Sequence, residues 1–175
     1  MNKPKSITQD DAILIRHHLT GQDRLIFDFA VETGLRISDI LNIRRNQIRK
    51  IMTIKESKTN KLKTVEISDG LLLCLPNHDF DDRLYLFSSP RSAFKPLHRS
   101  TYHRHIKKLS EWLKIDFSAH SMRKFYALNI FYTTEDIFAA QKALNHKYIT
   151  TTCSYLDIDL NALLKTVAKE TRPHA

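Results

Sequence analysis

The segment from Leu144 to Tyr155 reads LNHKYITTTCSY, and it determines how the other motifs of this chain are interpreted. It places an imidazole and a phenol, His146 and Tyr155, nine positions apart, with hydroxyl-bearing residues between them. Taken alone, this pair fits two ordinary half-buried side chains as well as it fits a reactive site. Its meaning therefore depends on the reactive groups that the rest of the chain supplies.

The composition is that of a basic globular domain. The chain has 175 residues, of which 42% are hydrophobic and 27% charged, enough for one domain with a sizeable core. Its 28 Lys and Arg residues outnumber 19 Asp and Glu residues, which gives a net charge of +9. This excess predicts a polyanionic partner, with nucleic acid ahead of an acidic membrane surface. The alternative is a solvated basic face that has no partner.

Cysteine usage and hydropathy indicate an intracellular protein. Cys74 and Cys153 are the only cysteines, and two distant thiols make neither a disulfide framework nor a zinc site. They fit a reducing cytoplasm. The N-terminus lacks the apolar core of a signal peptide, and no apolar run approaches the length of a membrane span. We therefore expect a soluble cytoplasmic protein with no membrane partner.

The first part of the chain predicts three helices. Thr8 is a good N-cap because acidic residues follow it in the first turn. This first helix is expected to end at Gly21. A second helix is expected from about residue 23 to a C-terminal stop at Gly34. A short third helix is expected over residues 36–43, with its apolar side chains facing inward.

The middle of the chain predicts a β-hairpin. Residues 47–55 favour a strand, and residues 62–68 alternate in a second strand beyond a polar turn. One face of the second strand carries Lys63, Val65 and Ile67. The hairpin is the only sheet element that the pattern predicts firmly.

The remaining elements are expected to be mostly helical. Asp69 is expected to cap a short helix that stops at Pro76, residues 84–87 to form a third strand, and residues 88–97 to form a loop. Helices are then expected at 99–114, 118–131, 134–144 and 160–167. The fold class is therefore mainly α with a small antiparallel β-sheet (α+β).

Several residues outside the 144–155 segment could hold a phosphate group. Arg36 lies at a helix start, Lys58 lies in the hairpin turn, and Arg123 lies three residues after His120 on one helix face. Each also has an ordinary interpretation. Arg36 could pair only with Asp39, Lys58 could be a solvated turn lysine, and His120 could bond to backbone at a helix start.

Taken together and in order, these residues resemble the tyrosine recombinase (phage integrase) family. The matching motifs are, in chain order, TGLRISDI at 33–40, SKT at 57–59, HSMR at 120–123, and LNH at 144–146 followed by Tyr155. An ordered match of six reactive positions is a specific signal. The resemblance implies the recombinase catalytic-domain fold.

Two motif positions depart from the family pattern. The family usually has Gly before its second histidine, where this chain has Asn145, a residue type that tolerates left-handed backbone angles. The family commonly has Glu three residues after its first arginine, where this chain has Asp39. Neither difference removes a reacting group.

The resemblance implies a role for each matching residue. Tyr155 would be the nucleophile that forms a 3′-phosphotyrosyl link to DNA. Arg36 and Arg123 would clamp the phosphate, because guanidinium groups match phosphate oxygens. The supporting roles would be a general acid at Lys58, assistance to proton transfer at His120, a hydrogen bond to a phosphate oxygen from His146, and orientation of Arg36 or His120 by Asp39. No metal or cofactor is implied.

Double-stranded DNA is the expected partner. The helix over 99–114 is the most basic one, and Arg104, Lys107 and Lys108 are the candidates for contacts to the DNA backbone. The family works as a tetramer on DNA with C-terminal segments exchanged between subunits, so residues 158–175 are a candidate for exchange. Packing of that segment on its own domain is the alternative. A monomer in the absence of DNA is compatible with both.

The resemblance covers nearly the whole chain, as one catalytic domain over residues 1–175. Most relatives carry a further N-terminal domain that closes around DNA, and here the motifs begin almost at once. The chain is either a fragment or similar to the single-domain recombinases that control fimbrial phase switching. The start at Met1 favours a naturally short protein, encoded by a bacterium, phage or mobile element, although a fragment can also begin with Met.

Two other functions remain as alternatives to an active recombinase. One is a non-catalytic DNA-binding relative that acts as a regulator. The other is a type IB topoisomerase-like enzyme that nicks and rejoins DNA without strand exchange. Binding without a covalent complex would favour the first alternative, and nicking without exchange would favour the second.

Overall fold

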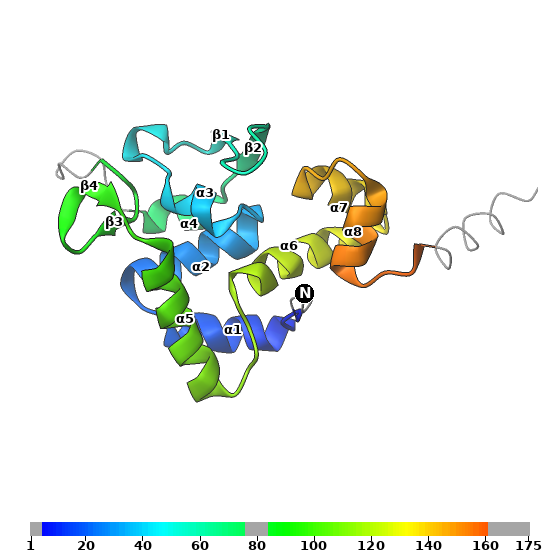
Figure 1. Ribbon diagram of the computed structural model, residues 1–175, viewed down its shortest axis with the longest axis horizontal. Coiled ribbons are helices and arrows are strands. Elements are labelled where there is room, and N and C mark those ends of the chain that lie inside the picture. The colour runs from blue at the N-terminus through cyan, green and yellow to red at the C-terminus, as the bar shows by residue number, and fades with distance from the viewer. Residues whose placement is uncertain (1–4, 76–83, 161–175) are drawn as a thin grey trace, which may run out of the picture. The chain divides into compact units, whose positions relative to one another are not determined.

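The computed structural model describes residues 5–75 and 84–160 (Figure 1). Its contacts divide the chain after Tyr126 into an N-terminal unit and a C-terminal unit, which are described separately. The prediction of a single domain over the whole chain stays a prediction. Among the described residues, no helix combines the length and apolar character that crossing a membrane requires.

The N-terminal unit contains most of the secondary structure. Its elements are α1 (Gln9–His18), α2 (Gly21–Thr33), α3 (Ile37–Leu41), the 3-10 helix η1 (Arg45–Gln47), β1 (Ile51–Lys55), β2 (Leu62–Glu66), α4 (Asp69–Cys74), β3 (Ser88–Ser89), β4 (Ser92–Pro96), α5 (Arg99–Leu113) and the first half of α6 (Ala119–Thr134). The C-terminal unit holds the rest of α6, then α7 (Ile137–Leu144) and α8 (Ile149–Leu156). The predicted fold class, mainly helical with small antiparallel sheets, is confirmed.

The first helix starts where the sequence predicts and ends earlier. Thr8 and Asp11 form a capping box, with the Thr8 hydroxyl accepting from the Asp11 N–H at 3.1 Å and the Asp11 carboxylate accepting from the Thr8 N–H at 2.8 Å. The helix ends at His18 because Leu19 turns to an extended backbone and buries its side chain. The prediction that Gly21 ends this helix is therefore wrong, since Gly21 begins α2.

The end of α2 is confirmed at Gly34. This residue has the left-handed angles φ 59° and ψ 20°, and its N–H donates to the Ala30 carbonyl. A side chain could not be accommodated here, because a Cβ built on Gly34 would lie 2.0 Å from the Tyr126 ring. The sharp turn leads directly to Arg36 and α3, which place the first predicted site motif.

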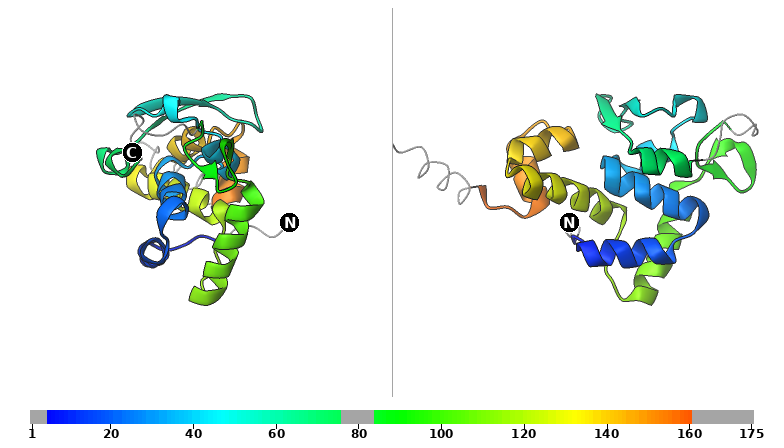
Figure 2. Two further views of the ribbon diagram at one scale, coloured as in Figure 1. Left: turned by 90° about the vertical axis from the view of Figure 1, so that its left-hand side faces the viewer. Right: turned by 180° about the vertical axis from the view of Figure 1, so that it is seen from behind.

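The β1–β2 hairpin is confirmed as an antiparallel pair, with Thr53 opposite Thr64. Alternate residues of both strands are buried, with Met52 and Ile54 on β1 matched by Lys63 and Val65 on β2. The hairpin lies to one side of the helices of its unit in all three views (Figures 1 and 2). Its turn carries the SKT motif.

The region after α4 differs from the sequence prediction. Residues 84–87 do not form a strand of either sheet. Tyr85 makes an isolated antiparallel bridge with Arg44, and Leu86 and Phe87 are buried in the core. The short hairpin of β3 and β4 replaces the predicted loop at 88–97, with Ser89 opposite Ser92.

The cap of α4 also differs from the prediction. The hydroxyl of Ser68 accepts from the Leu71 N–H at 3.1 Å, so Ser68 is the N-cap and Asp69 is the first helical residue. The predicted stop at Pro76 lies outside the described residues.

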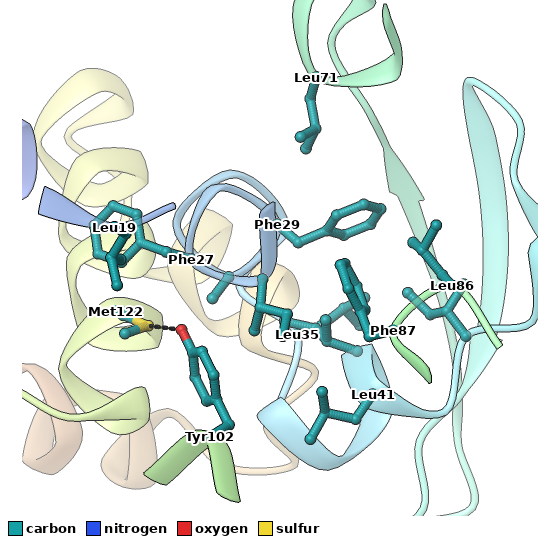
Figure 3. Close-up of a cluster of buried hydrophobic side chains, with 14 of the residues drawn as sticks. Leu19, Phe27, Phe29, Leu35, Leu41, Leu71, Leu86, Phe87, Tyr102 and Met122 are labelled. Carbon is teal, nitrogen blue, oxygen red and sulfur yellow. Dashed lines mark hydrogen bonds between the residues drawn. The ribbon is translucent and has the colours of Figure 1, made fainter. Parts of the chain in front are cut away.

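The core of the N-terminal unit is built around α2. Phe29 meets Phe87 edge to face, with ring centroids 5.9 Å apart, and Leu35 packs beside them (Figure 3). Tyr102 on α5 is almost fully buried and directs its hydroxyl at the Met122 sulfur on α6 at 3.8 Å. These contacts fix the start of α6, which carries the HSMR motif.

The C-terminal unit has a small core of its own. The buried residues are Ala127, Ile137, Ala140, Leu144, Cys153 and Leu156. The predicted helix 134–144 begins three residues late because Asp136 caps it, accepting from the Phe138 N–H at 2.7 Å. The helix predicted at 160–167 lies outside the described residues apart from Leu160.

Candidate active site

Four predicted site residues line one cavity of about 390 Å³ in the N-terminal unit. They come from separate segments: the residue before α3, the hairpin turn and the first turns of α6. The predicted residues that line the cavity are Arg36, Lys58, His120 and Arg123. The structure therefore brings together side chains that are up to 87 positions apart in the sequence.

Arg36 is the N-cap residue of α3 and has an extended backbone, and its side chain makes no capping hydrogen bond to the helix. Its Nη1 donates to the Oε1 of Glu56 at 2.5 Å. The ordinary alternative of an Arg36–Asp39 pair is not what the structure shows. A guanidinium has five N–H donors, so this ion pair leaves Arg36 with donors to offer an anion.

Arg123 is 4% exposed on the first turns of α6. Its Nη1 donates to the carbonyl oxygen of Gly34, and its Nη2 lies 4.0 Å from the Oε1 of Glu56. The turn that ends α2 and the carboxylate after β1 together position this guanidinium. Both predicted phosphate-binding arginines therefore face the same buried carboxylate.

Glu56 is the residue that the sequence analysis missed. It is fully buried, and its second oxygen accepts from the Thr59 hydroxyl at 2.6 Å. A buried carboxylate is costly unless it is paired and hydrogen-bonded, and Glu56 satisfies both conditions. The burial of Glu56 could have been expected from the alternation of the strand, because Met52, Ile54 and Glu56 follow one another at every second position on the inward face of β1 and its continuation.

Asp39 supports the hairpin turn instead of an arginine. It is 3% exposed, and its Oδ1 accepts from the N–H of Ser57 at 2.9 Å and from the Ser57 hydroxyl at 2.6 Å. The expectation that Asp39 orients Arg36 or His120 is not matched by these contacts. Its carboxylate instead holds the residue next to Lys58, whose own side chain is exposed at the cavity.

His120 lies at the cavity among positive charges. Loss of hydration, followed by the nearby charges of Arg99 and Arg123, lowers its pKa from the ordinary 6.5. The imidazole is therefore neutral at pH 7 and able to accept a proton. Arg99, the first residue of α5, also lines the cavity and was not singled out in the sequence.

His146 and Tyr155 lie together in the C-terminal unit. Their rings meet edge to face with centroids 5.8 Å apart, and the Nδ1 of His146 lies 3.1 Å from the Thr152 hydroxyl. Tyr155 lies on α8, a helix that the sequence analysis did not predict. Asn145 ends α7 with φ 56° and ψ 34°, so the left-handed turn expected at this position is confirmed.

The predicted DNA-contacting residues are exposed. Arg104, Lys107 and Lys108 all lie on α5, and Lys107 makes a surface ion pair of 3.8 Å with Glu111. An exposed pair of this kind contributes little to stability. A role in DNA binding for these residues stays a prediction.

The sequence profile described as the phage integrase family matches residues 5–161. The chain belongs to the phage integrase family. It is 29% identical to the probable integrase/recombinase YoeC of Bacillus subtilis (strain 168) over 143 residues, which are 79% of this chain and 78% of YoeC. It is 26% identical to the tyrosine recombinase XerA of Thermococcus onnurineus (strain NA1) over 176 residues, covering 95% of this chain. This chain therefore spans only 62% of the length of that XerA.

Solved structures of the family share the fold. The crystal structure of XerA recombinase matches with a TM-score of 0.74 at 21% identity, covering 99% of this chain and 66% of that one. The catalytic domain of bacteriophage HP1 integrase matches with a TM-score of 0.68 at 20% identity, covering 95% of both chains. A lambda integrase dimer bound to a COC′ core site matches with a TM-score of 0.72 at 20% identity, covering 90% of this chain and 49% of that one.

Proposed function

We propose that this phage integrase family chain breaks and rejoins DNA strands in site-specific recombination, with Tyr155 as the nucleophile. The observation that carries the proposal is the cavity that gathers two arginines, a lysine and a histidine, with both arginines next to the buried carboxylate of Glu56. Such a cluster is suited to one phosphodiester group. The likeness to a lambda integrase bound to its core site supports DNA as the partner.

The chemistry assigned to the residues follows from their types. Arg36 and Arg123 neutralise the non-bridging phosphate oxygens and stabilise the charge that develops in the transition state. The Tyr155 oxygen forms a bond to phosphorus while the bond from phosphorus to the 5′ oxygen breaks. Lys58 protonates the departing 5′ oxygen, and neutral His120 accepts the phenolic proton.

The covalent intermediate explains how strands are exchanged without an energy source. The 3′-phosphotyrosyl link conserves the energy of the phosphodiester bond, and the 5′-hydroxyl of a partner strand attacks it to rejoin the DNA. His146 contributes a hydrogen bond to the phosphate. We further propose that the exposed cations of α5 contact the DNA backbone, that the enzyme acts as a homotetramer on cytoplasmic DNA, and that residues 158–175 are exchanged between subunits.

The test is a covalent-adduct assay on nicked duplexes made from the DNA that surrounds the gene. A nick near the cleavage position releases a short fragment, so the phosphotyrosyl adduct accumulates and is visible on a denaturing gel. We expect the adduct with the wild-type protein and none with Tyr155→Phe. The matched control is Tyr148→Phe, because Tyr148 is an exposed tyrosine in the same unit and that variant should form the adduct normally.

The outcomes separate the alternatives. An adduct that persists in Tyr155→Phe would show that another residue is the nucleophile. Salt-sensitive DNA binding without any adduct would indicate a non-catalytic DNA-binding relative. An adduct together with relaxation of supercoiled DNA and no exchanged products would indicate topoisomerase-like activity.

A further inference from the structure

Lys63 is a buried lysine that none of the proposed steps uses. It lies on β2 opposite Ile54 and is 7% exposed. Its Nζ donates to the carbonyl oxygen of Thr33 at 2.9 Å and lies 5.3 Å from the centroid of the Tyr126 ring. Lysine is rarely buried to this extent without a partner that compensates for its lost hydration.

The hydrogen bond of Lys63 links it to Arg123 through two consecutive peptide groups. Lys63 binds the Thr33 carbonyl, and Arg123 binds the carbonyl of the next residue, Gly34. Two cationic side chains from β2 and α6 therefore hold consecutive peptide groups of the turn that leads to Arg36. A change at the Lys63 amine therefore acts next to the carbonyl that holds the Arg123 guanidinium and on the backbone that leads to Arg36.

Charged and titratable groups face Lys63 from each element packed around it. They are Arg123 and Tyr126 on α6, Arg36 and Asp39 at α3, and Glu56 after β1. Burial, followed by the positive charge of Arg123, lowers the pKa of Lys63 to about 7, while Glu56 opposes this change. The amine therefore exchanges its proton near neutral pH.

The charge of Lys63 is separable from its structural role. An ammonium group and a neutral amine both have N–H donors, so the bond to the Thr33 carbonyl can persist in either form. The neutral form leaves one positive charge fewer behind the arginines. An anion in the cavity favours the charged form, because an opposite charge nearby stabilises an ammonium group.

We propose that Lys63 is a positioning residue for the phosphate-binding arginines and that its amine takes up a proton when an anion occupies their cavity. The inference rests on the proposed function, in that it takes this cavity to be the phosphate site. Proton uptake on binding means that anion affinity rises as the pH falls through the range in which free Lys63 titrates. Protonation of Lys63 would make the affinity for DNA depend on pH without any contact between Lys63 and DNA.

The probe is sulfate, which mimics a phosphate group and does not itself titrate between pH 6 and 8. Binding is followed by NMR at constant ionic strength in the wild type, Lys63→Arg and Lys63→Met. We expect the dissociation constant of the wild type to rise from pH 6 to pH 8 by up to about tenfold more than that of Lys63→Arg, as linkage to one additional titrating group requires, because His120 at the cavity is present in both proteins. Lys63→Arg keeps its charge and should bind sulfate more tightly than Lys63→Met at both pH values.

Two controls keep the test decisive. Arg36→Ala should abolish sulfate binding, because the anion is expected on the arginine pair. The ¹³Cε signal of Lys63 in the wild type, assigned by its loss in Lys63→Met, should titrate near neutral pH and shift to a higher midpoint when sulfate is added. This second measurement decides the matter even if Lys63→Arg fails to fold.

Three results would overturn the inference: no sulfate binding that depends on Arg36, an unchanged pH dependence in folded Lys63→Arg, or a Lys63 midpoint that sulfate does not move. None of these measurements uses DNA cleavage. A missing adduct in the cleavage assay would therefore count against the proposed function alone, and an unresponsive Lys63 in a protein that does form the adduct would count against this inference alone.

Discussion

Replacement of Glu56 by glutamine should strongly destabilise the N-terminal unit. The change keeps the shape of the side chain but removes a negative charge that lies within 4.0 Å of two guanidinium groups, those of Arg36 and Arg123. The side chains of these arginines are 19% and 5% exposed, so water screens their mutual repulsion poorly. The variant would leave two cations in a largely buried site.

The magnitude follows from the burial of the pair. Removing one partner of a buried ion pair costs about 3–5 kcal/mol, because the remaining charge is left without compensation. Arg36 is partly exposed, and the amide oxygen of the introduced glutamine can still accept a hydrogen bond, so we expect a loss at the low end, about 3 kcal/mol. That is a large part of the total stability of a typical domain, about 5–15 kcal/mol.

Urea denaturation at pH 7 measures the loss directly. The matched control is Glu66→Gln, which removes an exposed carboxylate from β2 of the same hairpin and should change the stability by less than about 0.5 kcal/mol. Sulfate should stabilise Glu56→Gln more than the wild type, because the anion can replace the missing carboxylate between the arginines.

The reasoning fails if Glu56→Gln loses no more stability than Glu66→Gln. It also fails if sulfate stabilises the wild type and Glu56→Gln equally, since that would mean that the arginines do not depend on Glu56 for compensation of their charge. A lower m-value in the variant would instead indicate a change in the compactness of one of the states, and the comparison would then use the urea midpoint together with far-UV circular dichroism.

Three further predictions concern local features. Gly34→Ala should cost at least about 2 kcal/mol in urea denaturation, because alanine disfavours the left-handed angles and its Cβ would collide with the Tyr126 ring; a near-neutral effect would show that the turn relaxes freely. Asn145→Ala should lose about 1 kcal/mol and Asn145→Gly nothing, as thermal melts would show, and equal losses would exclude a left-handed requirement. The pKa of His120 is lowered in the folded protein, so the unfolded chain binds the proton more tightly, and the free energy of unfolding falls as the pH drops below about 6.5. His120→Asn should remove this part of the pH dependence of stability, and an unchanged profile of the free energy of unfolding against pH would contradict the prediction.

Local sequence signals predicted the parts of the fold that local chemistry governs. Thr8 and Gly34 mark helix ends because caps and left-handed turns have strong residue preferences. Gly21 was misassigned because glycine can begin a helix as well as follow one. The β3–β4 hairpin was missed because its strands are short and include Pro96, which argues against a strand.

The reacting groups of the site could be predicted, but the groups that hold them could not. Arg36 and Arg123 are recognisable from motif spacing. Their common partner Glu56 begins a polar stretch that has the composition of an ordinary turn, and its place two residues after Ile54 is the one sequence signal that its side chain is buried. The same limit applies to Asp39, whose contact with Ser57 depends on a hairpin 18 positions away.

The turn that carries Lys58 has a mechanical consequence. The residues on both sides of Lys58 donate hydrogen bonds to buried carboxylates, Ser57 to Asp39 and Thr59 to Glu56. The backbone at Lys58 therefore has little freedom, and the reach of the amine is set by the length of its methylene chain. Lys58 can be replaced chemically by lysine homologues with shorter or longer methylene chains. The chain length that gives the fastest DNA cleavage would then report the distance from the hairpin to the departing oxygen.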